Sequence, residues 1–145
     1  MAHTILITGA NGFIGSHVTR LLESVGHNVV PMDVVPRSPD LSLLGIKTRG
    51  HIMNVTDAAA FRALCAREKP THVFHAAHPP RTETPEVLNY CYHAMTNILE
   101  AVKDLGIIRV VYSSSASIYG QLKKPEGSLV KEDDAVTIYP TYFYR

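Results

Sequence analysis

The chain has 145 residues, of which 46% are apolar and 19% are charged, and its formal net charge is +1. This length allows one domain with a substantial core, and the composition excludes a disordered chain. The small charge gives no general attraction to nucleic acid or an acidic membrane surface, and no apolar run is long enough to span a bilayer. With two cysteines and no leader-like start, the expected location is cytoplasmic.

The first part of the chain alternates between strand and helix. Residues 4–8 form a short β-branched and apolar run, which is typical of a strand buried on both faces of a parallel sheet. Apolar residues then recur at helical spacing over 13–25, and residues 27–33 predict a second strand. Pro31 within this strand indicates that it is irregular or locally near an edge.

After a loop at 35–40 the alternation continues. The expected elements are a helical turn at 41–44, a strand at 50–54, a helix at 58–68, a strand at 71–76, a helix at 86–105 and a strand at 109–113, followed mostly by loop from 120 to 137. Thr56 or Asp57 can cap the helix that begins at Ala58. This order predicts an α/β fold with a Rossmann-like, doubly wound parallel sheet and helices on both faces.

The chain ends on an aromatic cluster at 139–145, without a helix cap or a polar tail. It contains no internal repeat and no linker, so we expect residues 1–145 to form a single unit. Because a complete domain rarely ends in this way, we expect that unit to be truncated before its last strands and before any substrate domain.

The turn after the first predicted strand has glycines at 9, 12 and 15. The first allows a tight turn, the second lets the backbone approach a phosphate, and the third lets the helix pack against the strand. The amide groups and the positive end of the helix dipole then face the phosphate. We therefore predict a pyrophosphate site for a dinucleotide, with contacts from Gly9, Asn11, Gly12, Phe13, Ile14 and Gly15.

Asp33 closes the second predicted strand, 24 positions after Gly9. A carboxylate there can accept hydrogen bonds from the adenosine ribose hydroxyls and repel a 2′-phosphate, which favours NAD over NADP. Arg37 nearby keeps NADP open as the alternative cofactor. The plainer interpretation of Asp33 is a solvated loop residue.

Four segments follow one another along the chain: TGANGFIG at 8–15, VFHAA at 73–77, NILEA at 97–101 and VYSSSASIYG at 111–120. In order and spacing they resemble the N-terminal part of an extended short-chain dehydrogenase/reductase of the epimerase/dehydratase family. The resemblance implies a Rossmann domain, a substrate domain built mostly from later sequence, and hydride transfer between nicotinamide and a small-molecule substrate such as a nucleotide-sugar. It also implies a homodimer, for which the helix at 86–105 is the candidate surface.

The family's chemistry uses a tyrosine as acid/base, a lysine four residues after it, and a serine that hydrogen-bonds the substrate oxygen. The resemblance places the serine at Ser115 and gives Ser113 a role in packing against the cofactor or capping the strand. The tyrosine is Tyr142 or Tyr144, and in both cases the lysine position falls beyond Arg145. We prefer Tyr144, because Arg145 would occupy the place where the family has serine or threonine after Tyr142.

The resemblance also implies further cofactor contacts. His75 is expected near the cofactor, with Ala76 and Ala77 small enough to let it approach. Asn54 replaces the aspartate that the family places near the adenine, and Val55 follows it. Aligned on Asn97, Cys91 stands where the family has an asparagine.

Two further expectations concern histidines and tyrosines. His72, His75 and His78 are spaced by three on a strand and loop, so they do not share a face, and we expect no metal site. Tyr90 and Tyr92 are expected at the surface or an interface. The leading function is an NAD-dependent epimerase/dehydratase-type oxidoreductase, and the alternatives are a non-catalytic dinucleotide-binding module and an NADP-dependent carbonyl reductase.

Overall fold

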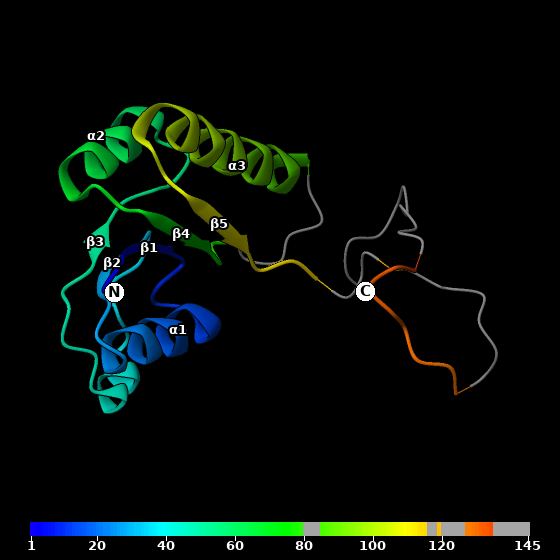
Figure 1. Cartoon of the computed structure of the whole chain (residues 1–145), viewed down its shortest axis with the longest axis horizontal. Coiled ribbons are helices and arrows are strands. Elements are labelled where there is room, and N and C mark those ends of the chain that lie inside the picture. Colours follow the sequence, from blue (N-terminus) through cyan, green and yellow to red (C-terminus); the bar gives the residue numbers. More distant parts are fainter. Residues whose placement is uncertain (80–84, 116–118, 120–126, 135–145) are drawn as a thin grey trace.

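The computed structural model describes residues 1–79, 85–115, 119 and 127–134. Strands and helices alternate along the chain, as Figure 1 shows: β1 (Thr4–Thr8), α1 (Phe13–Ser24), β2 (Asn28–Asp33), the 3-10 helix η1 (Pro39–Leu44), β3 (His51–Ile52), α2 (Ala58–Glu68), β4 (His72–His75), α3 (Pro85–Leu105) and β5 (Arg109–Tyr112). The strands pair in the order β3-β2-β1-β4-β5, and every pair is parallel. The predicted α/β, Rossmann-like fold is thus confirmed.

Helices cover both faces of the sheet. In Figure 1, α1 lies on one face, and α2 and α3 lie on the other. Side chains of β1 alternate between the two cores, because successive residues of a strand point to opposite faces. Leu6 packs in the larger core under α2 and α3, whereas Ile5 and Ile7 pack in the smaller core that includes Val18 of α1.

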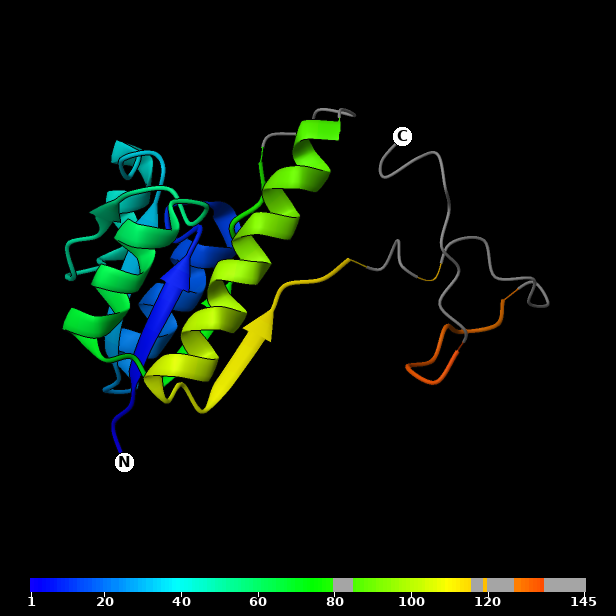
Figure 2. The same ribbon diagram turned by 90° about the horizontal axis from the view of Figure 1, so that it is seen from above.

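The neighbours of β1 decide where a ligand can bind. From β1 the chain passes to β2 on one side, and it later crosses over to β4 on the other side. In parallel α/β sheets, a crevice forms at the carboxyl ends of the strands where the order reverses in this way. Gly9 follows β1 and Ala76 follows β4, so both lie at this reversal. In Figure 2, α3 runs alongside β5, with its axis close to the direction of the strands.

β3 is shorter than the strand expected at 50–54. It pairs with Met32 and Asp33 of β2, and the backbone NH of Met53 extends this ladder by donating to the Asp33 carbonyl at 2.8 Å. Within the described residues, the ladder between β2 and β3 does not reach Pro31. The missing NH of Pro31 therefore costs no ladder hydrogen bond, which agrees with the expected local edge.

Of the two candidate caps for α2, Asp57 is the one used. Its Oδ1 accepts a hydrogen bond from the backbone NH of Ala60 at 3.0 Å, and Lys69 ends the helix in the left-handed conformation. An ion pair of 2.8 Å between Arg62 and Asp104 joins α2 to α3 at the surface. Among the described residues, none of the helices combines the length and apolar character needed to cross a membrane.

Candidate functional site

The glycine turn between β1 and α1 is held by close backbone contacts. Gly9 has a φ of +70°, and a Cβ there would come within 2.7 Å of the Ala77 nitrogen. A Cβ on Gly15 would overlap the carbonyl group of Gly9. A Cβ on Gly12, by contrast, would meet only the Gly9 oxygen, at 3.4 Å. The outer glycines therefore allow the strand ends and the helix to touch, and Gly12 leaves open space in front of the helix.

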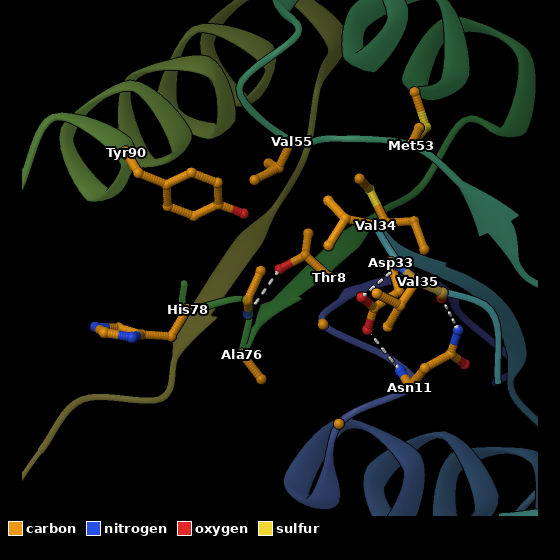
Figure 3. Close-up of a pocket in the computed structure, with 14 residues that line it drawn as sticks. Thr8, Asn11, Asp33, Val34, Val35, Met53, Val55, Ala76, His78 and Tyr90 are labelled. Carbon is orange, nitrogen blue, oxygen red and sulfur yellow. Dashed lines mark hydrogen bonds between the residues drawn. The ribbon is translucent and has the colours of Figure 1, made fainter. Parts of the chain in front are cut away.

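The carboxylate of Asp33 ties the end of β2 to this turn. Its Oδ2 accepts a hydrogen bond of 2.8 Å from the backbone NH of Asn11, and its Oδ1 accepts one of 3.3 Å from Val35. The side-chain amide of Asn11 donates in turn to the carbonyl of Val35 at 2.7 Å (Figure 3). Asp33 is half-buried and is thus part of the turn's framework rather than a solvated loop residue.

A cleft of about 300 Å³ opens between the turn, the ends of β2 and β4, the segment after β3, and α3. Seven of the predicted cofactor residues line it: Gly9, Asn11, Gly12, Asp33, Val55, Ala76 and Ala77. The other lining residues are Thr8, Met32, Val34, Val35, Met53, His78 and Tyr90. Much of this wall is apolar, with the carboxylate of Asp33 at one side, as Figure 3 shows.

The first turn of α1 begins at the edge of this cleft. Gly12 is the N-cap and has no side chain to accept a hydrogen bond from the helix, so the turn carries no side-chain cap. Phe13 and Ile14 are exposed and Gly15 is buried, and none of the three lines the cleft. What the first turn offers to a ligand is therefore backbone NH groups and the positive end of the helix dipole.

His75 is buried behind Thr8, which lines the cleft, and does not line the cleft itself. The side chain is only 2% exposed, its Nδ1 lies 2.6 Å from Oγ1 of Thr8, and its ring stacks on Tyr112 at 5.4 Å. Burial lowers the pKa of His75 to about 4, and the nearby His78 adds to the effect. Thr8 Oγ1 also accepts a bond from the backbone NH of Ala77. The Thr8 hydroxyl can then donate its own hydrogen bond to Nδ1 of His75. We therefore assign the imidazole proton to Nε2.

Several predicted site residues lie away from the cleft. Asn54 is exposed, and its Oδ1 accepts a hydrogen bond from the backbone NH of Thr56 at 3.0 Å. The backbone NH of Ser113 donates to the His75 carbonyl at 2.9 Å, next to the end of β5, and Ser115 is half-buried two residues later. Tyr142 and Tyr144 lie outside the described residues.

Tyr90, expected at the surface or an interface, is half-buried and lines the cleft, a site role that was not predicted from the sequence. A signal for it exists in the sequence. Tyr90 precedes Ala94 by four residues, and Ala94 and Ile98 are buried, so all three share one face of α3. Met53, Val34 and Val35 were also missed, although Met53 and Val34 directly follow the carboxyl ends of β3 and β2 and Val35 comes one residue later.

The chain matches proteins of one family along most of its length. The profile of the NAD dependent epimerase/dehydratase family matches residues 5–144. A UDP-glucose 4-epimerase of Drosophila melanogaster is 31% identical over 83% of this chain and 39% of its own length. A GDP-mannose 3,5-epimerase 1 of Oryza sativa subsp. indica is 30% identical over 97% of this chain and 38% of its own length.

A solved structure shows the same likeness. The UDP-glucose 4-epimerase of Thermus thermophilus, crystallised in complex with NAD, superposes with a TM-score of 0.79 and 26% identity, covering 92% of this chain and 44% of that one. The chain spans about two fifths of the length of the curated relatives named above, at 39% and 38%. The fold, the glycine turn and the match over residues 5–144 agree: this chain belongs to the NAD dependent epimerase/dehydratase family.

Proposed function

We propose that the chain is the NAD-binding part of an NAD-dependent, nucleotide-sugar epimerase or dehydratase. One observation carries the proposal. The cleft places a glycine turn, open in front of Gly12, beside the half-buried carboxylate of Asp33 at the sheet's reversal point. Helix N-termini of this kind bind phosphate, and a carboxylate at the end of the second strand binds ribose.

The residues present fit an adenosine diphosphate group. The NH groups at the start of α1 would hold the pyrophosphate, because Gly12 leaves space for it. Each oxygen of Asp33 accepts one backbone NH and retains a lone pair for a ribose hydroxyl. The apolar wall at Val34, Met53 and Val55 would cover the base.

The surroundings of Arg37 support NAD over NADP. Its guanidinium donates to the carbonyl oxygens of Ile46 at 3.5 Å and Thr48 at 3.3 Å, and the side chain does not line the cleft. Glu23 accepts hydrogen bonds from the backbone of Lys47 and Thr48, which holds the same loop. Arg37 is thus committed to that loop, and Asp33 is left to repel a 2′-phosphate.

The catalytic part of the proposal rests on the family pattern. A bound nicotinamide would exchange a hydride with a carbon of a small-molecule substrate, proposed to be a nucleotide-sugar. Ser115 would hydrogen-bond the substrate oxygen, and Tyr144 or Tyr142 would transfer the proton. Reading the gene past the codon for Arg145 tests this step: a lysine four residues after one of these tyrosines supports it, and another residue at both positions contradicts it.

Calorimetric titration with NAD and NADP tests the binding proposal directly. Wild type should bind NAD, and Gly12→Ala should weaken this binding about tenfold or more because a methyl group enters the phosphate space. Gly50→Ala is the matched control. A Cβ there also has its nearest neighbour at 3.4 Å, but Gly50 lies outside the cleft lining. Equal NAD affinity in the two variants, or no binding by wild type, would contradict the proposal.

The non-catalytic alternative predicts NAD binding without turnover. A longer chain that carries the lysine should oxidise or epimerise a nucleotide-sugar if the enzyme proposal is right. If such a chain binds NAD and leaves a panel of nucleotide-sugars unchanged, the binding-module alternative is favoured.

We also propose a homodimer through α3 and a location in the cytosol. Leu88, Tyr92 and Leu99 are exposed along one side of α3, which supports a partner surface there. Sedimentation of wild type and Leu99→Glu tests the dimer, and a wild type that stays monomeric at all concentrations contradicts it. Cell fractionation tests the location.

A further inference from the structure

Tyr90 enters the cleft from α3, on the side opposite Asp33, as Figure 3 shows. Its direction follows from how α3 is held. Ala94, Ile98 and Ala101 are fully buried on the same helix face. These residues lie one, two and three turns beyond Tyr90. The helix α3 therefore cannot rotate about its axis and turn this face away from the core.

A polar contact fixes α3 to the wall of the cleft itself. The side-chain amide of Asn97 donates to the carbonyl oxygen of Val55 at 2.9 Å, and Val55 lines the cleft. Asn97 lies seven residues after Tyr90, which places both on one face of the helix. Tyr90 is thus presented to the cleft by a rigid element rather than by a loop.

The hydroxyl of Tyr90 is available to a ligand. Figure 3 shows it pointing into the cleft between Val55 and Ala76. Burial raises the pKa of the phenol, and the negative charge of Asp33 raises it further, so the group keeps its proton at neutral pH. No residue in the described part of the chain hydrogen-bonds this hydroxyl. A half-buried O–H group beside apolar side chains gains most from a partner that arrives with the ligand.

The position of Asp33 decides which part of the ligand reaches Tyr90. If Asp33 accepts the ribose hydroxyls, the base extends from the ribose over the apolar residues Met53 and Val55. Those side chains can cover the faces of a flat base, but they cannot recognise its polar edge. Across the cleft from Asp33, Tyr90 brings both an aromatic ring and a hydroxyl.

We propose that Tyr90 recognises the base of the bound dinucleotide, with its hydroxyl hydrogen-bonded to the polar edge of a 6-aminopurine. The inference rests on the proposed NAD-binding function and adds to it a hydrogen bond to the base. Adenine offers both acceptor nitrogens and an exocyclic amine at its edges, and a phenol can donate to the first or accept from the second. Hypoxanthine has a carbonyl in place of that amine, and the same phenol can donate to it.

Titration calorimetry of the whole chain with NAD and with nicotinamide hypoxanthine dinucleotide tests this assignment. Wild type should bind both dinucleotides, because the hydroxyl can accept from the amine of adenine or donate to the carbonyl of hypoxanthine. Tyr90→Phe keeps the ring and removes only the hydroxyl. It should lower both affinities about fivefold to tenfold, because neither base edge keeps its partner. Tyr90→Leu, which also removes the ring, should lower both affinities further.

Tyr92→Phe is the matched control, because Tyr92 lies two residues further along the same helix and is 67% exposed. It should leave both affinities unchanged, and thermal unfolding should show that all variants are folded. The chain has seven tyrosines and no tryptophan, so quenching of tyrosine fluorescence by the bound base gives a second readout that Tyr90→Phe should diminish.

The outcomes separate this inference from the function beneath it. If wild type binds neither dinucleotide, the NAD-binding function and the role of Tyr90 are both wrong. If wild type binds NAD and Tyr90→Phe keeps the wild-type affinity for both dinucleotides, the function stands and only the assignment of Tyr90 is overturned.

Discussion

Oγ1 of Thr8 lies 2.6 Å from Nδ1 of His75, and the same oxygen accepts a hydrogen bond from the backbone of Ala77. One buried hydroxyl therefore joins the ends of β1 and β4 beneath the cleft. The imidazole in this arrangement is neutral at pH 7, because burial lowers the pKa of His75 to about 4.

This pKa predicts a pH-dependent stability. The unfolded chain binds a proton on His75 below about pH 6.5, whereas the folded chain does so only below about pH 4. Between these values the unfolded state holds more protons, so the free energy of unfolding falls as the pH is lowered from 6.5 towards 4. The full effect is about 3 kcal/mol. Urea unfolding at a series of pH values should show it.

His75→Gln should flatten most of that slope, because it removes the titrating group. A smaller slope remains from the half-buried His72, whose pKa is lowered by burial and by the charges of His3, Arg109 and His27. His93→Gln, at an exposed position on α3, serves as the control. A slope that is the same in His75→Gln and wild type would show that His75 does not titrate as described.

Gly15→Ala should destabilise the chain by about 3 kcal/mol or more, because the new Cβ overlaps backbone atoms of Gly9 that cannot move independently of the turn. Gly12→Ala should have a free energy of unfolding within about 1 kcal/mol of the wild-type value, because the new Cβ meets no atom closer than 3.4 Å. Chemical denaturation measures both. Similar losses in the two variants would mean that the outer and middle glycines do not differ in role.

Asp33→Asn should reduce the preference for NAD over NADP about tenfold, which corresponds to about 1.4 kcal/mol. An asparagine oxygen can still accept the backbone NH of Asn11, so the turn is kept while the charge is lost. Titration with both cofactors measures the ratio. Asp40→Asn, an exposed carboxylate on η1, should leave it unchanged. An unaltered ratio in Asp33→Asn would remove the charge argument for NAD.

Asp57→Ala should lower the free energy of unfolding by about 1 kcal/mol, because α2 loses the side-chain acceptor for the NH of Ala60. Thr56→Ala should change it by no more than about 0.5 kcal/mol, as its side chain is not the cap. Urea unfolding compares the two. A larger loss in the Thr56 variant would reverse the assignment of the cap.

The sequence predicted those features that depend on residue type and short-range order. The strand at 4–8 and the glycine turn can be predicted from their own residues, without knowledge of the rest of the chain. Asp33 was found because its distance from Gly9 is set by one βαβ unit. The profile match confirms the family inferred from the four segments.

Other features depend on packing that no local pattern reveals. Tyr90 reaches the cleft only because Ala94 and Ile98 fix the rotation of α3 about its axis. Asn54 and Val55 are neighbours in sequence, yet only Val55 lines the cleft, since the chain turns sharply where Asn54 accepts the NH of Thr56. The roles of Ser115, Tyr142 and Tyr144 stay predictions.

The contact of Gly9 with both Ala77 and Gly15 has a consequence for how binding specificity can vary in this fold. The turn touches the chain after β4 through Gly9 and the first turn of α1 through Gly15, so a side chain added at either outer glycine overlaps the backbone of a neighbouring segment. Substitutions that change what the cleft accepts must therefore accumulate on the opposite walls. The turn proposed to hold the phosphate would then be the fixed part of the cleft, and the walls proposed for sugar and base would be the variable part.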